Sequence, residues 1–134
     1  MIEVKKIAIT DIAHLYPEIY LSVFDEIDPF QCPSIVYLGF ENGNYIGFLS
    51  GYLHNARTFL IQYAGLIREH RGYKTLVIFR EAMKEIEKEY RYIMCLISNK
   101  NSSALRLTLK EGFLIHGIRQ DTLGDLYVEL IKEA

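Results

Sequence analysis

Apolar and polar residues alternate most regularly in the middle of the chain, where the pattern predicts three consecutive strands. The first two strands are separated by a short polar segment that contains Asn42-Gly43. This dipeptide favours a β-hairpin, because both residues tolerate the positive φ that a tight turn requires. The sequence therefore predicts an antiparallel meander. Its strands are residues 34–40, 45–53 and 58–67.

A helical pattern follows the third strand. Apolar residues recur every three or four positions over residues 74–89, which predicts a helix with one buried face. The buried stripe consists of Leu76, Phe79, Met83, Ile86 and Tyr90. The intervening charged residues predict a face exposed to solvent. They are Arg80, Glu81, Lys84, Glu85, Glu87 and Lys88.

The first quarter of the chain predicts a strand and two short helices. Residues 2–9 alternate imperfectly, as in a strand, and Thr10-Asp11 is a plausible helix cap. Helical spacing then continues to Ile27 with Pro17 inside it. Because proline lacks an N–H and clashes with the preceding turn, we expect a kink or a restart at Pro17. Two prolines in residues 28–33 indicate a loop.

The last third of the chain predicts a parallel strand and a final hairpin. Residues 92–98 form an unbroken apolar run, typical of a strand covered on both faces. A strand, a helix and a second strand indicate a right-handed crossover, so this strand is expected to lie parallel to residues 58–67. A helix is predicted over 102–111, with Gly112 as its C-terminal cap. The last strands are residues 113–118 and 126–131.

Composition limits the class of protein. The 134 residues suffice for a single α/β domain with one core, and 50% hydrophobic with 24% charged residues is a globular composition. A net charge of −2 argues against a nucleic-acid partner that is bound by broad phosphate neutralisation. No apolar stretch is long enough to span a membrane, and the N-terminus lacks the pattern of a signal peptide. We therefore expect a cytoplasmic protein.

Cysteines and histidines predict no special chemistry. Cys32 and Cys95 are too few for a disulfide framework, and Cys95 in its apolar run is expected to be a small buried hydrophobe. Cys32 stands beside a proline in a predicted loop, and no motif supports reactivity there. No metal is implied, because the histidines have no ligand spacing with the cysteines. The four histidines are His14, His54, His70 and His116.

The junction between the third strand and the helix is suited to a phosphate group. Backbone N–H groups at a helix start point outward without intrahelical partners, and the helix dipole adds positive potential. Four basic side chains surround the same glycine-containing turn. They are Arg68, His70, Arg71 and Lys74.

Two motifs in this order of elements resemble the GNAT superfamily of N-acetyltransferases. Residues 71–76 lie over the R-G-x-G-x-G/A turn of that family, and residues 101–113 lie over its N-x-x-A-x-x-L-Y-E-K-x-G-F segment. The second motif matches without a gap at Asn101, Ala104, Leu107, Lys110, Gly112 and Phe113. The resemblance implies a mixed, mostly antiparallel sheet with a splayed parallel central strand pair, flanked by helices, in one domain over residues 1–134.

The resemblance also implies acetyl-CoA as cosubstrate. The basic turn would hold its pyrophosphate, and main-chain groups near Leu66 and Ile67 would pair with the pantetheine arm like an added strand and hold the thioester carbonyl. Gly65 suits either a bulge that opens the gap or close packing against a helix. Asn101 would contact the arm, cap its helix, or do both. The expected cofactor-binding residues are Leu66, Ile67, Arg71, Gly72, Tyr73, Lys74, Thr75, Asn101 and Arg106.

The phosphate turn departs from the family pattern at two positions. Lys74 stands where the family has its second glycine, and Leu76 stands where it has a third small residue. The glycines of the family let the backbone approach the phosphates closely. Lys74 would block that approach, place an ammonium on the phosphates, or lie exposed in the first helical turn.

Proton transfer has no obvious residues. Thr108 stands where many family members have the tyrosine that protonates the leaving thiolate, and Tyr127 is a substitute candidate. The third strand offers Gln62 but no carboxylate where the family often has a glutamate base. The candidate bases are Glu69 and His70 at the end of that strand, with His54 as a further alternative.

The family resemblance implies transfer of acetyl from acetyl-CoA to a primary amine by direct attack. The small-molecule or peptide acceptor would enter beside the first helices and their loop, where aromatic and acidic residues either attract a cation or belong to the core and the polar surface. A homodimer is possible. The alternatives are a domain of the same fold that binds or regulates without catalysis, and a PAS-type sensor. The residues on the acceptor side are Tyr16, Tyr20, Phe24, Asp25, Glu26, Asp28 and Phe30.

Overall fold

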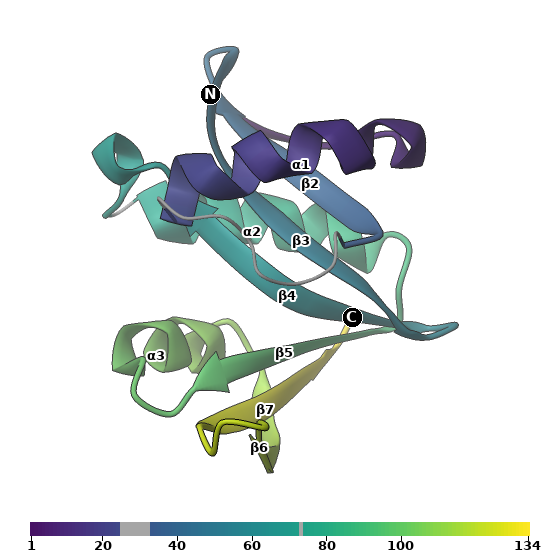
Figure 1. The fold of residues 1–134 in the computed structure, drawn as a ribbon, viewed down its shortest axis with the longest axis vertical. Coiled ribbons are helices and arrows are strands. Elements are labelled where there is room, and N and C mark those ends of the chain that lie inside the picture. Colours follow the sequence, from purple (N-terminus) through teal and green to yellow (C-terminus); the bar gives the residue numbers. More distant parts are fainter. Residues whose placement is uncertain (25–32, 73) are drawn as a thin grey trace.

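A computed structural model of the chain describes residues 1–24, 33–72 and 74–134. In these ranges the chain forms a single seven-stranded sheet flanked by helices (Figure 1). The strands are β1 (Ile2–Lys6), β2 (Ile35–Glu41), β3 (Asn44–Asn55), β4 (Thr58–Leu66), β5 (Tyr92–Ser98), β6 (Leu114–Gln120) and β7 (Leu126–Glu133). The helices are α1 (Ile9–Phe24), the short 3₁₀ helix η1 (Arg68–His70), α2 (Lys74–Glu87) and α3 (Ser102–Lys110).

The strand order is β1-β2-β3-β4-β5-β7-β6, and every neighbouring pair is antiparallel except β4 and β5. The predicted meander and the parallel pair are therefore confirmed. The predicted hairpin is confirmed as well, because Asn42 and Gly43 have φ values of 50° and 84°. The first strand is shorter than expected and ends at Lys6.

The sheet has a hydrophobic cluster on each face. Adjacent residues of one strand point to opposite faces, and Val36 packs in the cluster beneath α1 whereas Tyr37 packs in the cluster beneath α2. Leu105 of α3 joins the α2 cluster, so α2 and α3 cover the same face. Cys95 is buried there, which raises the pKa of its thiol to about 12 and confirms its prediction as a small hydrophobe.

Helix α1 corrects the sequence prediction for Pro17. The helix runs without interruption from Ile9 to Phe24 with Pro17 inside it. Pro17 removes the hydrogen bond to the carbonyl of Ala13, but both residues are exposed, so water solvates that carbonyl. Tyr16 and Tyr20 are buried on the sheet on either side of Pro17 and hold both halves of the helix in place.

The start of α1 also differs from the expectation. Thr10 and Asp11 lie within the first helical turn instead of preceding it, so the predicted cap is wrong. Asp11 lies where the helix dipole favours a negative charge. The predicted end at Ile27 and the loop over residues 28–33 lie outside the described residues, apart from Pro33.

Strand β4 contains a bulge, but not at Gly65. The partners of Ser50 and Gly51 on β3 are Tyr63 and Ile61, which leaves Gln62 as the extra residue. A Cβ atom on Gly65 would lie 2.6 Å from Cγ1 of Val23. Gly65 is therefore small because α1 packs directly against it, and the alternative of a bulge at this residue is wrong.

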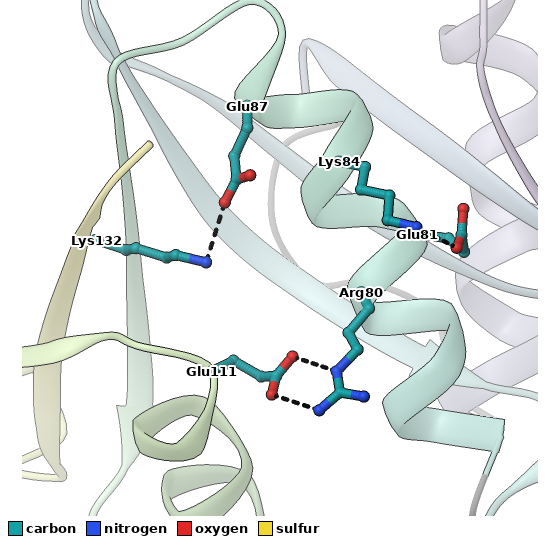
Figure 2. Close-up of polar contacts among 6 residues, drawn as sticks. All are labelled: Arg80, Glu81, Lys84, Glu87, Glu111 and Lys132. Carbon is teal, nitrogen blue, oxygen red and sulfur yellow. Dashed lines mark hydrogen bonds and ion pairs between the residues drawn. The ribbon is translucent and has the colours of Figure 1, made fainter.

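Ion pairs join the two halves of the sheet on the face of α2 (Figure 2). Arg80 of α2 donates two hydrogen bonds, of 2.8 and 3.2 Å, to the carboxylate of Glu111 beyond α3. Glu87 of α2 lies 3.0 Å from the ammonium of Lys132 on β7. Arg80 is exposed, as predicted, and Glu87 is half-buried, and both also bridge to the C-terminal half.

The described helices include none with both the length and the apolar character needed to cross a membrane.

We expect Gly65→Ala to destabilise the fold by about 1–3 kcal/mol, because the branched Val23 side chain has little freedom to move away. Urea unfolding measures the change. Gly117→Ala is the matched control, since its new Cβ would have an ordinary 3.5 Å contact with Glu129. Equal effects of the two substitutions would contradict the packing role of Gly65.

The Arg80–Glu111 pair predicts a pH-dependent stability. The hydrogen bond from Arg80 lowers the pKa of Glu111 below its ordinary value of 4.5. Its stabilisation is therefore fully present above pH 4.5 and is lost as the pH falls through the lowered pKa. Glu111→Gln should reduce the free energy of unfolding at pH 7, and the difference from wild type should disappear in acid.

Urea titrations at several pH values test this expectation. Glu81→Gln is the control, because its partner Lys84 lies on the same helix and the pair joins no separate elements. A Glu111→Gln effect that stays constant across the whole pH range would exclude the ion pair as its cause.

Candidate functional site

The main cleft lies where β4 and β5 separate. These strands pair only over residues 58–61 and 92–95, although both continue beyond those residues (Figure 1). A cleft of about 980 Å³ opens at this gap and is lined by residues of all five strands from β1 to β5 and of α1, α2 and α3. The predicted splayed pair is therefore present.

The hydrogen bonds of β4 determine which main-chain groups face this cleft. The N–H of Ile67 donates to the carbonyl of Ile46 on β3 at 2.8 Å, so Ile67 and Ile46 form a hydrogen-bonded pair of the antiparallel ladder. In an antiparallel ladder such pairs alternate with pairs whose main-chain groups point away. Ala64 and Leu66 therefore turn their N–H and C=O groups toward β5, and both residues line the cleft. The N–H of Ile67, near which the sequence predicts a pantetheine contact, already donates to β3, so Ala64 and Leu66 carry the main-chain groups that face the gap.

The same reasoning applies to β5. The N–H of Asn99 donates to the carbonyl of Leu126 at 3.1 Å, which fixes the alternation of the β5–β7 ladder. Ser98 consequently turns its main-chain groups away from β7 and toward the gap, where it lines the cleft. Two main-chain edges thus face each other across the gap. Ala64 and Leu66 belong to the β4 edge, and Ser98 belongs to the β5 edge.

The turn after β4 forms one end of the cleft. Gly72 has a φ of 120° and lines the cleft with Thr75, and no atom would lie within 4 Å of a Cβ on Gly72. The N–H of Thr75 donates to the carbonyl of Gly72 at 3.0 Å. The predicted phosphate site therefore opens into the cleft at these two residues. Tyr73 lies outside the described residues.

Arg71 lines the cleft and crosses its end. Its Nε donates to the carbonyl of Leu66 at 2.9 Å, and its Nη2 donates to the carbonyl of Val23 at 2.7 Å. The guanidinium has five N–H donors, so these two bonds leave further donors for an anion. Arg71 thereby connects the end of α1, the end of β4 and the phosphate turn.

Lys74 points away from the cleft. Its ammonium lies 2.7 Å from Oε1 of Glu41 and 3.3 Å from Nδ1 of His70, and it is not among the residues that line the gap. The hydrogen bond from Lys74 lowers the pKa of Glu41. In this structure Lys74 therefore neither fills the cleft nor faces it.

Helix α3 places two motif residues in the cleft and one outside it. The side chain of Asn101 accepts a hydrogen bond from the N–H of Ala104 at 3.2 Å, which confirms its capping role, and Asn101 lines the cleft. Thr108 also lines it, but its hydroxyl donates to the carbonyl of Ala104 at 2.7 Å. Arg106 is exposed and lies outside the lining.

Gln62 lines the cleft, although the sequence pattern predicts no function for it. It is the bulge residue of β4, and its Oε1 is buried without a hydrogen-bond partner among the described residues. The hydroxyl of Ser50, opposite the bulge, is also buried without a hydrogen-bond partner among the described residues. The closed end of the gap thus contains an unsatisfied acceptor. No local pattern reveals it, because a bulge depends on the register with β3.

The predicted proton-transfer residues lie outside the cleft lining. Glu69 and His70 belong to η1, and His70 lies 3.9 Å from Glu41. His54 lines a separate hollow of about 370 Å³. Tyr127 is opposite Ser98 on β7, and burial, followed by the charges of Asp121 and Asp125, raises its pKa.

The aromatic residues on the proposed acceptor side belong mainly to the core. Tyr16 and Tyr20 are buried, and their rings contact Phe48. Phe24 extends this cluster to the cleft, which it lines. The other residues predicted for this side, 25, 26, 28 and 30, lie outside the described ranges.

No protein-family model matches the sequence, and none of the curated proteins matches it. Three solved structures are similar in fold. The IAA acetyltransferase from Bacillus cereus ATCC 14579 has a TM-score of 0.79 at 16% identity, with 100% of both chains covered. The ribosomal-protein-S18-alanine N-acetyltransferase from Escherichia coli has a TM-score of 0.74 at 14% identity, with 99% of this chain and 94% of that chain covered.

The third is a GNAT family acetyltransferase from Elizabethkingia anophelis with acetyl-CoA bound, with a TM-score of 0.73 at 15% identity and coverage of 99% and 98%. These similarities, and the strand order described above, exclude the PAS-type alternative. The fold of this chain is that of the GNAT acetyltransferases.

Proposed function

We propose that this chain is an N-acetyltransferase that moves acetyl from acetyl-CoA to a primary amine by direct attack. The observation that carries the proposal is the cleft between β4 and β5, whose two main-chain edges face each other beyond Ile61 and Cys95. The resemblance in fold to a GNAT acetyltransferase with acetyl-CoA bound supports it.

The residues of the cleft fit the parts of the cosubstrate. Pantetheine carries two amides. The main chains of Ala64 and Ser98 and the N–H of Leu66 face the gap from both sides, whereas the carbonyl of Leu66 already accepts from Arg71. Gly72, Thr75 and the remaining donors of Arg71 suit a pyrophosphate at the start of α2. Ala64 would make the pantetheine contact in place of Ile67, whose N–H donates to β3.

The proposed reaction needs positioning more than acid–base chemistry. The amine nitrogen attacks the thioester carbonyl, whose oxygen is held by an N–H of Ala64 or Leu66. The C–S bond then breaks, the attacking nitrogen releases one proton to water to become an amide, and the thiolate leaves with a pKa of roughly 8.5 for a free thiol. Tyr127, opposite Ser98 but outside the cleft lining, stays the candidate that protonates this thiolate, and its raised pKa makes it a weak proton donor.

The acceptor amine must arrive uncharged or lose its proton to water. Within the described chain, the cleft lining includes no Asp, Glu or His side chain. Gln62 offers an unsatisfied carbonyl oxygen that suits an N–H of the acceptor. A weakly basic amine, such as a peptide α-amine, fits better than a lysine side chain (pKa of about 7.7–8.0 against about 10.4). The likeness in fold to an alanine N-acetyltransferase is consistent with such an acceptor.

Acetyl-CoA should raise the thermal stability of the protein. At 100 times its dissociation constant, a ligand adds about 2.7 kcal/mol to the free energy of unfolding. Thermal melts with acetyl-CoA, followed by assays of thiol release with a panel of amines, test both binding and transfer. No shift at millimolar acetyl-CoA would contradict the proposal. A shift without thiol release from any amine would instead identify a regulatory domain that binds the cosubstrate.

Two alanine substitutions distinguish the roles of the basic side chains at the phosphate turn. Arg71→Ala removes a charged donor that lines the cleft and should weaken acetyl-CoA binding by about 10-fold or more. Lys74→Ala removes a cation of the same turn that faces Glu41, and should leave the affinity nearly unchanged. Isothermal titration of both folded variants measures the difference. The opposite order of effects would show that Lys74 reaches the phosphates.

The rate should rise with pH toward the pKa of the acceptor amine, because only its neutral form attacks. Gln62→Glu would add a base at the closed end of the cleft and should increase kcat/KM at pH 7 by about 10²-fold. Gln62→Met, which keeps the length without an oxygen, is the control and should give no gain. A slower Gln62→Glu enzyme at every pH would place the acceptor elsewhere.

A further inference from the structure

The cleft extends well beyond the gap between β4 and β5. Its lining also includes Leu49 of β3, Tyr37 of β2 and Val4 of β1. Neighbouring strands lie about 4.8 Å apart, so Val4 is roughly three strand spacings, or about 14 Å, from β4. The cleft therefore has a side chamber that runs across the sheet, away from β5.

The side chamber lies between the sheet and α2. Leu49, Tyr37 and Ile61 belong to the hydrophobic cluster on the α2 face of the sheet, and all three line the cleft. On the helix, the lining residues recur at spacings of three and four, which places them on one side of α2. They are Thr75, Ile78, Phe79 and Ala82.

A row of cross-strand partners leads from the gap into the side chamber. Ala64 is opposite Leu49, and Leu49 is opposite Tyr37, so the three side chains share the α2 face of the sheet. Ala64 is exposed, whereas Leu49 and Tyr37 are buried. The small side chain of Ala64 thus leaves the entrance open, and the space over Leu49 and Tyr37 is narrow and shielded from bulk water.

The inner part of the side chamber is apolar. The hydroxyl of Tyr37 donates to Oε2 of Glu89 at 3.1 Å, so this side chain presents its ring to the chamber. Glu89 in turn accepts from Lys6 at the same distance, which occupies the carboxylate outside the chamber. Among the described residues, no charged side chain of the cleft lining other than that of Arg71, which lies at the phosphate turn, is available to the chamber. An uncharged, apolar occupant therefore fits it.

The direction of the donor brings its acyl group to this entrance. Gly72 and Thr75 follow β4 in the chain, so a donor whose pyrophosphate lies there passes Leu66 before it reaches Ala64. A thioester carbonyl that accepts from the N–H of Ala64 has its acyl carbon beside the Ala64 side chain. An acetyl group ends at this point, whereas a longer chain continues over Leu49.

We propose that the side chamber binds the acyl chain of the donor, and that this protein transfers unbranched acyl groups longer than acetyl, from butyryl to hexanoyl. The inference rests on the proposed function and keeps its chemistry. The amine nitrogen forms a bond to the acyl carbonyl carbon and releases one proton to water. The C–S bond breaks, and the sulfur leaves as the thiolate with the electron pair of that bond.

Isothermal titration of the full chain with acetyl-CoA, butyryl-CoA and hexanoyl-CoA tests the proposal. Each methylene buried in the chamber should tighten binding about fourfold, which corresponds to about 0.8 kcal/mol. Butyryl-CoA should therefore bind about 10-fold more tightly than acetyl-CoA. Isobutyryl-CoA has the same number of carbons in a branched chain and should gain less, because the chamber is narrow.

A substitution at Ala82 tests where the chain lies. Ala82 is buried and lines the chamber, and Ala82→Leu would fill it with a residue that suits a helix. Hexanoyl-CoA should then bind no more tightly than acetyl-CoA. Ala82→Val adds less volume and serves if the leucine variant does not fold. Ala13→Leu is the matched control, because Ala13 is exposed on α1 and outside the cleft lining, and it should keep the wild-type ratio of affinities.

Three results would overturn the proposal. They are equal or weaker binding of the longer thioesters by wild type, an Ala82 variant that folds and keeps the wild-type ratio, and butyryl-CoA that binds but releases no thiol with an amine that acetyl-CoA acylates. In each case acetyl-CoA would still bind, so the proposed function would stand. Absence of binding by acetyl-CoA itself would overturn both.

Discussion

Beyond Ile61, strand β4 stays paired with β3 but is no longer paired with β5, and the arrangement of the cleft depends on this difference. The pairing of Ile67 with Ile46 sets the alternation by which Ala64 and Leu66 face the gap. A buried main chain normally finds partners, so two facing edges without a common ladder form a site for an extended ligand that carries amides.

The two halves of the molecule are joined on either side of this gap by different interactions. On the face of α2, the ion pairs of Arg80 and Glu87 connect α2 to Glu111 and Lys132. At the mouth of the cleft, Arg71 holds the carbonyl of Val23 at the end of α1. Both halves of the molecule therefore have direct polar links across or beside the gap, in addition to the strand pairing over residues 58–61 and 92–95.

Much of the fold could be predicted from local patterns. The turn at Asn42 and Gly43, the parallel strand after the α2 crossover and the cap at Asn101 each depend on short-range chemistry or a strong topological preference. Pro17 could not be judged in this way, because its cost depends on which side of α1 faces water.

The site was less predictable than the fold. Lys74 has its partner 33 residues away, at Glu41, and the amide of Ile67 is used by a strand that the local sequence does not identify. The motif positions of the phosphate turn were found, but which side chains enter the cleft depends on such long-range contacts.

Gln62 is one extra residue in β4, because no residue of β3 is its partner in the ladder. With it left out, Ile61 and Tyr63 would follow each other on opposite faces, as they already do, and the register with β3 would be continuous. The pairing of β4 with β5 ends at Ile61, directly before Gln62, so this one residue stands at the point where the strands part. Removal of this residue would leave the core residues of both faces in place and would take the unsatisfied oxygen of Gln62 out of the cleft.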